Sequence, residues 1–188
     1  MNKWKVAFFI LAGSIVLVIV YLFYMATAPT DEVPRPVAVK AKGNVLVVQT
    51  TANEFESIAK QYLEDEIDKT PLPVAIEINE KIQLFSTLTV FGVDVPISMD
   101  FDPIVEEGNI VLKQTEVNVG KLNIPPKTVL KLMQDSIKFP SWITVLPNDE
   151  EIYVDVSRIK IASGSRVRAK EIDLANDKIL LEVILTID

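Results

Sequence analysis

An uncharged apolar stretch near the N-terminus constrains this chain more than any other feature of its sequence. Residues Val6–Met25 contain no charged side chain. As a helix that rises 1.5 Å per residue, they span about 30 Å, the thickness of the hydrocarbon core of a bilayer. The stretch therefore predicts a transmembrane helix, with residues 1–25 forming a short cytoplasmic stub and a membrane anchor.

The residues that flank this stretch predict its orientation. Lys3 and Lys5 precede it, whereas the first charges after it are Asp31 and Glu32. Because positive flanks are retained in the cytoplasm, we expect a single-pass protein of the cell membrane with the bulk of the chain extracytoplasmic. The predicted anchor residues, which include aromatic residues suited to the two interfaces, are Trp4, Val6, Tyr21, Tyr24 and Met25.

A cleaved signal peptide is the competing interpretation of the same stretch. The sequence Ala26-Thr27-Ala28 resembles a small-residue cleavage site. However, the apolar stretch is longer than a typical signal core, and Pro29 directly follows the candidate site, where it hinders cleavage. These two observations favour an anchor that is retained.

A proline-containing segment separates the anchor from the rest of the chain. Residues 26–43 contain Pro29, Pro34 and Pro36 among small and charged residues. This composition predicts a semi-extended spacer. The spacer sets a single domain, residues 44–188, off the bilayer but keeps it within reach of the membrane.

The composition of the chain excludes several classes of function. Beyond the anchor it has 17 basic and 26 acidic residues, a net charge near −9, which disfavours a nucleic-acid binder. The absence of cysteine and histidine removes thiolate and imidazole chemistry and most zinc, copper and haem ligands. We therefore expect no enzyme activity, no catalytic residues, no cofactor and no metal site.

Carboxylates and serines are the remaining candidates for chemistry, and each has a simpler interpretation. Asp94, Asp100 and Asp102 are close enough in sequence for glycoside hydrolysis or calcium binding. No ligand-rich loop surrounds them, so a strand end before Pro103 is the favoured interpretation. The segment Ser163–Ser165 lacks a base to activate a serine, and it is typical of a hairpin turn.

Apolar spacing predicts the elements of the domain. Residues 45–48 form a strand, and Thr51 with Glu54 forms a capping box that starts a helix ending before Pro71. Period-two alternation predicts strands over 74–84, 91–101 and 110–119, with a hairpin turn at 106–109. A second, shorter helix begins near Pro125, and the last three strands cover about 151–161, 166–174 and 178–187.

Several of these strands change the phase of their apolar residues midway. The change lies between Leu112 and Val117, between Val156 and Ile159, and between Ala169 and Ile172. A phase change switches the buried face, so each requires a bulge or strong coiling. We therefore predict an α+β fold: a strongly curved, mainly antiparallel β-sheet wrapped around one principal helix, with a short second helix.

Four segments together resemble the YpmS family of membrane-anchored proteins of Gram-positive bacteria. They are the anchor with its spacer, ANEFESIAKQYL, VGKLNIPPKTVLKLM and SRVRAKEIDLANDKILLEVIL, and the resemblance covers nearly the whole chain. These are packing and turn patterns, so they indicate a family and hardly a mechanism. The order of elements is also similar to tubular lipid-binding envelope proteins (TULIP-like), which implies an apolar groove between a coiled sheet and a long helix.

Apolar residues on the two helices and on the connector 139–147 are the candidate binding residues. The helical stripe is explained by core packing, but it also suits a lipid groove with a void beneath the helix. The connector either lines the mouth of such a groove, touches the membrane interface, or seals the core. The candidate lipid-groove residues are Phe55, Ile58, Tyr62, Leu63, Met133, Phe139 and Trp142.

The leading functional hypothesis is a non-catalytic, membrane-anchored envelope protein that binds a lipid or lipid-linked amphiphile. The alternative is a protein-interaction or accessory module that tethers or regulates a membrane-associated envelope enzyme, for which an exposed edge strand suffices. A carboxylate-dependent hydrolase is the third and most remote hypothesis. Nucleic acid is not expected as a partner.

Overall fold

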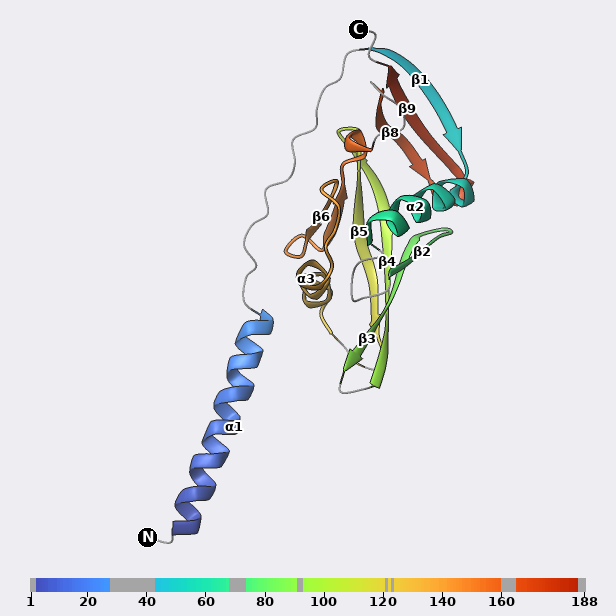
Figure 1. Ribbon diagram of the computed structural model, residues 1–188. Coiled ribbons are helices and arrows are strands. Elements are labelled where there is room, and N and C mark those ends of the chain that lie inside the picture. The colour runs from blue at the N-terminus through green and yellow to red at the C-terminus, as the bar shows by residue number, and fades with distance from the viewer. Residues whose placement is uncertain are drawn as a thin grey trace. The chain divides into compact units, whose positions relative to one another are not determined.

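A computed structural model describes residues 3–27, 43–67, 74–90, 93–120, 122, 124–159 and 165–185 (Figure 1). It divides the chain into two units, Met1–Asp31 and Glu32–Asp188. The first holds the helix α1 (Lys3–Thr27), whose segment Trp4–Tyr21 is long and apolar enough to cross a membrane. Most of the predicted spacer, residues 28–42, lies outside the described residues.

Antiparallel strands dominate the second unit, which we call the folded domain. A six-stranded sheet has the order β2-β3-β4-β5-β7-β6, and a three-stranded sheet has the order β1-β9-β8 (Figure 1). The strands are β1 (Asn44–Thr50), β2 (Val74–Ile78), β3 (Ile82–Val90), β4 (Val93–Glu106), β5 (Asn109–Val119), β6 (Ile143–Leu146), β7 (Glu151–Val154), β8 (Ser165–Asp173) and β9 (Lys178–Leu185).

Two α-helices and two single-turn 3-10 helices complete the described part of the folded domain. They are α2 (Ala52–Ile67), α3 (Pro126–Ser136), η1 (Val156–Arg158) and η2 (Leu174–Asn176). Pro126 occupies the first turn of α3, where a missing N–H group costs little. The predicted α+β class, with mainly antiparallel strands and few helices, is thus confirmed. The strands form two sheets rather than one.

Sequence patterns also predicted the hairpin turn and the bulges that curve the sheets. Glu107 (φ 49°) and Gly108 (φ 85°) form the tight turn between β4 and β5, as in a type I′ hairpin. The β4–β5 register shifts so that Thr115 is an extra residue in β5, and the β8–β9 register shifts at Lys170. Two of the three predicted phase changes are therefore bulges.

Three local predictions were wrong. The predicted strand 74–84 is a hairpin of β2 and β3. The three-residue turn between Ile78 and Ile82 keeps the alternation in phase, so the sequence pattern does not reveal the turn. The predicted strand 151–161 ends at Val154, because the Asp155 carboxylate accepts a hydrogen bond from the Ser157 N–H and starts η1. The connector 139–147 contains a strand, β6, which pairs with β7.

One hydrophobic core joins the two sheets. Met99 and Phe101 of β4, Leu130 of α3 and Ala169 of β8 belong to the same buried cluster. Phe101 is 0% exposed and is among the largest buried side chains. The opposite face of the six-stranded sheet carries a smaller buried cluster of Val111, Leu146 and Tyr153.

Polar contacts hold α2 in place between β2 and β9 (Figure 1). The predicted capping box is formed: Glu54 N–H donates to Thr51 Oγ1, and Thr51 N–H donates to Glu54 Oε2, both at 3.3 Å. Ala52 N–H donates to Asp177 Oδ1 at 2.7 Å, which fixes the first turn to the chain just before β9.

A carboxylate in the second turn of α2 attaches the helix to the open edge of the six-stranded sheet. Ile78 N–H, on the free side of β2, donates to Glu56 Oε2 at 2.6 Å. Lys60 donates to the other oxygen of the same carboxylate. These hydrogen bonds, the one from Lys60 first, lower the pKa of Glu56 below its ordinary value of 4.5.

Truncation of the central core residue tests the packing of the two sheets. Phe101→Ala is expected to lower the free energy of unfolding by about 3–5 kcal/mol, because it leaves a cavity in a fully buried site. Urea unfolding followed by circular dichroism measures the change. Ile104→Ala on the same strand, where the side chain is 42% exposed, is the control and should cost less than about 1 kcal/mol.

Replacing the α2 carboxylate tests its attachment to β2. Glu56→Gln is expected to lower the free energy of unfolding by about 1 kcal/mol near pH 7, because a charge-assisted hydrogen bond becomes a neutral one. Since the folded pKa is lowered, this stabilisation is complete above about pH 5 and disappears as the pH falls through the folded pKa. Urea unfolding across that range should show the two proteins converging in acid. If the free energies of unfolding of the two proteins differ equally at every pH, or not at all, the stabilising role of the Glu56 carboxylate is contradicted. Glu80→Gln, at an exposed turn position, is the control.

Candidate functional site

An apolar cavity of about 180 Å³ lies beneath α2. Its lining side chains are aliphatic or aromatic, and only Tyr62 and Trp142 carry a polar group. The lining residues are Phe55, Ile58, Ala59, Tyr62, Val74, Ile76, Ile78, Ile82, Leu84, Ile110, Leu112, Phe139, Trp142, Ile143, Ile152, Val154, Val156, Ile159, Val167 and Leu181. A cavity without polar partners does not retain ordered water, so this site suits an apolar group.

Elements far apart in the sequence form the walls of the cavity. On α2, Phe55, Ala59 and Tyr62 recur at helical spacing and form one side. The inward-facing residues of β2, β3, β5 and β7 form the floor by strand alternation, as with Ile76 and Ile78. The connector before β6, the segment around η1, and single residues of β8 and β9 form the remaining wall.

Partly exposed lining residues indicate where the cavity reaches the surface. Ile58 lines the cavity although its side chain is 48% exposed. Phe139 and Trp142 of the connector also line it and are only partly buried. We therefore place the mouth of the cavity at Ile58 and at the connector.

The structure brings five of the seven sequence-predicted groove residues to this cavity. Phe55, Ile58, Tyr62, Phe139 and Trp142 all line it. Met133 is buried in the core beneath α3 and does not line the cavity. The side chain of Leu63 lies outside the described residues.

Sequence reasoning missed most of the cavity floor and one position on α2. Ala59 continues the apolar stripe of α2, and its small side chain leaves room beneath the helix. Ile110 and Leu112 were predicted as strand residues facing the core, but their alternation does not reveal a void next to them. Val167 comes from the other sheet, and no local pattern connects it with α2.

The titratable groups with shifted pKa values do not line the cavity. Burial, with the nearby Asp155 carboxylate, raises the pKa of Tyr153 on the opposite face of the sheet. Hydrogen bonds from Thr50 and Thr51 lower the pKa of Glu54 at the start of α2. Hydrogen bonds from Asn176 lower the pKa of Asp173 at the η2 turn. These shifts are explained by caps, turns and burial.

The three candidate carboxylates make separate contacts along β4. Asp100 Oδ1 accepts a hydrogen bond from Gln83 at 3.0 Å, and Asp94 Oδ1 accepts one from Thr89 at 2.7 Å. Asp102 lies 3.9 Å from the Lys81 Nζ. Within the described residues, no group of three or more carboxylates is placed to hold a metal ion.

A second hollow of about 540 Å³ lies over β2, β3, β4 and the end of β5. It is wide open to solvent, and Ser86, Ser98 and Asn118 stand among its apolar lining residues. It is larger than the cavity beneath α2 but more open to solvent. The cavity beneath α2, which is less open and more uniformly apolar, is therefore the better candidate site.

Comparison with known proteins agrees with the family resemblance. The chain is 27% identical over 180 residues to the "Uncharacterized protein YpmS" of Bacillus subtilis (strain 168), and the alignment covers 95% of each chain. No solved structure matches the chain, so the likeness to tubular lipid-binding proteins stays a prediction. The family described as "Uncharacterized protein conserved in bacteria (DUF2140)" matches residues 2–185. The chain therefore belongs to the DUF2140 family, and within it resembles YpmS over nearly its whole length.

Proposed function

We propose that this protein is a non-catalytic, membrane-anchored envelope protein whose folded domain binds the apolar chain of a lipid or lipid-linked amphiphile. The single observation that carries the proposal is the cavity beneath α2, which is lined by apolar side chains and opens to the surface at Ile58 and the connector. The predicted anchor adds a source of ligand. A helix able to cross a membrane keeps the domain next to bilayer lipid, with the domain on the extracytoplasmic side.

The volume of the cavity limits what it holds. A cavity of about 150 Å³ lined by aliphatic and aromatic residues accepts benzene. The cavity beneath α2, about 180 Å³, thus accommodates one apolar chain segment and not two complete acyl chains. We propose that a single chain enters at the mouth, and that α2 moves outward if a longer part of the chain is taken up.

A phenylalanine side chain introduced into the cavity tests the proposal. The chain has two tryptophans, so Trp4→Phe leaves Trp142, a lining residue, as the only tryptophan fluorophore. In nanodiscs of phosphatidylcholine, decanol is expected to shift the emission of Trp142. Adding Ala59→Phe fills the cavity and should weaken this binding by at least about tenfold.

The matched control places the same ring on the outer face of the helix. Gln61→Phe, at an exposed position of α2, should leave decanol binding unchanged. Thermal unfolding of both variants verifies that the fold is intact. Equal decanol affinity with and without Ala59→Phe, or no response of Trp142 in the parent chain, would disprove lipid binding at this cavity.

One surface of the folded domain favours the second candidate function, a protein-interaction module. Among the described strands, β1 lies at the edge of its sheet, and four successive apolar residues, Val45–Val48, are each 45–55% exposed. Strand β1 also lacks the charges and prolines that protect natural edge strands from pairing. A partner protein that adds a strand beside β1 would cover both the open edge and these side chains.

Photo-crosslinking in membranes distinguishes this second function. A crosslinker in place of Val47 should capture one partner protein in stoichiometric amount, whereas one in place of exposed Asp102 should not. Mass spectrometry identifies what is captured. Crosslinks to many proteins or to none would exclude a dedicated partner at β1.

A further inference from the structure

The apolar lining of the cavity continues onto the three-stranded sheet β1-β9-β8 (Figure 1). Val167 of β8 and Leu181 of β9 both line the cavity. They stand on one face of this sheet, which we call its inner face. Val183 lies directly opposite Val167 in the β8–β9 register and is partly buried. Because residues opposite each other on paired strands share a face, Val183 extends the apolar lining along β9.

Strand β1 adds two exposed apolar side chains to the inner face. Val48 lies opposite Leu181, and Leu46 lies opposite Val183. Side chains opposite each other on paired strands have Cβ atoms about 4.5–5.5 Å apart, so Val48 adjoins a residue that lines the cavity. Leu46 is nevertheless 55% exposed and Val48 45% exposed. The lining of the cavity thus passes into an apolar surface that is open to solvent. We call it the inner strip, and it consists of Leu46, Val48, Leu181 and Val183.

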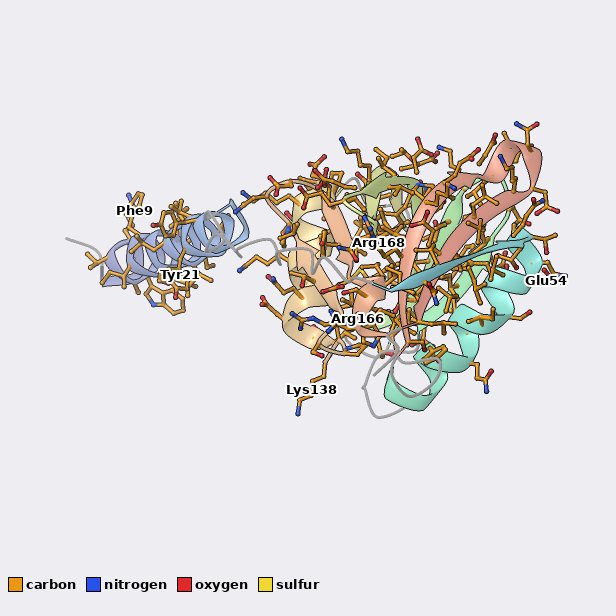
Figure 2. All side chains as sticks on the ribbon, turned by 90° about the horizontal axis from the view of Figure 1, so that it is seen from above. Phe9, Tyr21, Glu54, Lys138, Arg166 and Arg168 are labelled. Carbon is orange, nitrogen blue, oxygen red and sulfur yellow. The ribbon has the colours of Figure 1, made fainter. Side chains whose placement is uncertain are left out.

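The outer face of the same sheet has a different composition. Arg166 and Arg168, both labelled in Figure 2, alternate with Val167 along β8 and therefore stand on the outer face. Glu182 of β9 lies opposite Arg168, and Val47 of β1 lies opposite Glu182. Charged side chains thus occupy two of the three strands on that face. An apolar chain that leaves the cavity is therefore favoured on the inner strip and disfavoured on the outer face.

The volume of the cavity explains why a long chain needs such a surface. A cavity of about 150 Å³ accepts benzene. The 180 Å³ beneath α2 therefore hold only a short part of a long acyl chain. Each methylene group moved from water into a fully apolar environment raises the affinity about fourfold. Methylene groups beyond the cavity obtain part of this gain on the inner strip, and none of it in water.

We infer that the ligand is an amphiphile with one long linear chain, part of which fills the cavity while its far end lies on the inner strip; this inference rests on the proposed function. The strand register carries it, because it places the exposed residues Leu46 and Val48 in continuity with the cavity lining. All four residues of the inner strip are aliphatic, so the occupant is hydrocarbon and not a headgroup. The headgroup remains at the mouth of the cavity, at Ile58 and the connector.

Photo-crosslinking at two adjacent residues of β1 tests this inference in the full chain, held in nanodiscs of phosphatidylcholine. One variant carries benzoylphenylalanine in place of Leu46. The matched control carries it in place of Val47, which is 53% exposed but stands on the outer face. The probe is hexadecanol with an alkyne tag at the end of its chain. We expect an adduct with the probe at Leu46 and none at Val47.

Blocking the cavity distinguishes a chain that passes through it from lipid that touches β1 directly. Ala59→Phe fills the cavity and should abolish the adduct at Leu46. An excess of untagged decanol, which occupies the cavity, should abolish it as well. Circular dichroism verifies that each crosslinker variant is folded. If the Leu46 variant does not fold, Val48, on the same face of β1, takes its place.

The outcomes separate this inference from the proposed function. If decanol does not shift the emission of Trp142 in the Trp4→Phe chain, the cavity fails as a ligand site and the inference fails with it. If decanol shifts this emission but hexadecanol forms no adduct at Leu46, or equal adducts at Leu46 and Val47, only the path along the inner strip is overturned. An adduct at Leu46 that persists with Ala59→Phe and with excess decanol would also overturn it, because the strip would then contact the bilayer directly.

Discussion

The attachment of α2 by hydrogen bonds, rather than by complete packing, is the constraint on which the cavity depends. Ala52 N–H is bound by Asp177, and the Glu56 carboxylate binds the open edge of β2 at Ile78. These contacts fix the first two turns of the helix, while Ala59, on the side facing the sheets, is too small to fill the space below. A helix held only by apolar contacts would settle onto the sheet and close this space.

Local signals in the sequence predicted the elements that depend on neighbouring residues. The capping box at Thr51 and Glu54, the hairpin turn at Glu107–Gly108 and the bulges at Thr115 and Lys170 each follow from short-range stereochemistry. The pairing of strands that are far apart in the sequence does not follow from such local signals. Strand β1 pairs with β9 across most of the domain's sequence, which separates the strands into two sheets, and nothing local in either strand specifies that partner.

The residues of the candidate site could likewise be predicted only where local sequence patterns identify them. Apolar spacing identified Phe55 and Tyr62 on α2, and the aromatic connector identified Trp142. The same reasoning selected Met133, which is buried beneath α3 instead, because an apolar stripe shows that a side chain faces inward and not which space it borders. The void itself depends on how helix, sheets and connector fit together, a property of the packed structure.

A predicted membrane anchor, an apolar cavity and a mouth at the connector together form a consistent account of an amphiphile-binding envelope protein. Native mass spectrometry of the full chain, released from its own membrane in a detergent too bulky to enter the cavity, tests the central claim most directly. The account predicts one bound amphiphile per folded chain, of a mass class that fits a single inserted apolar chain. A chain that is released folded and carries no amphiphile would contradict it.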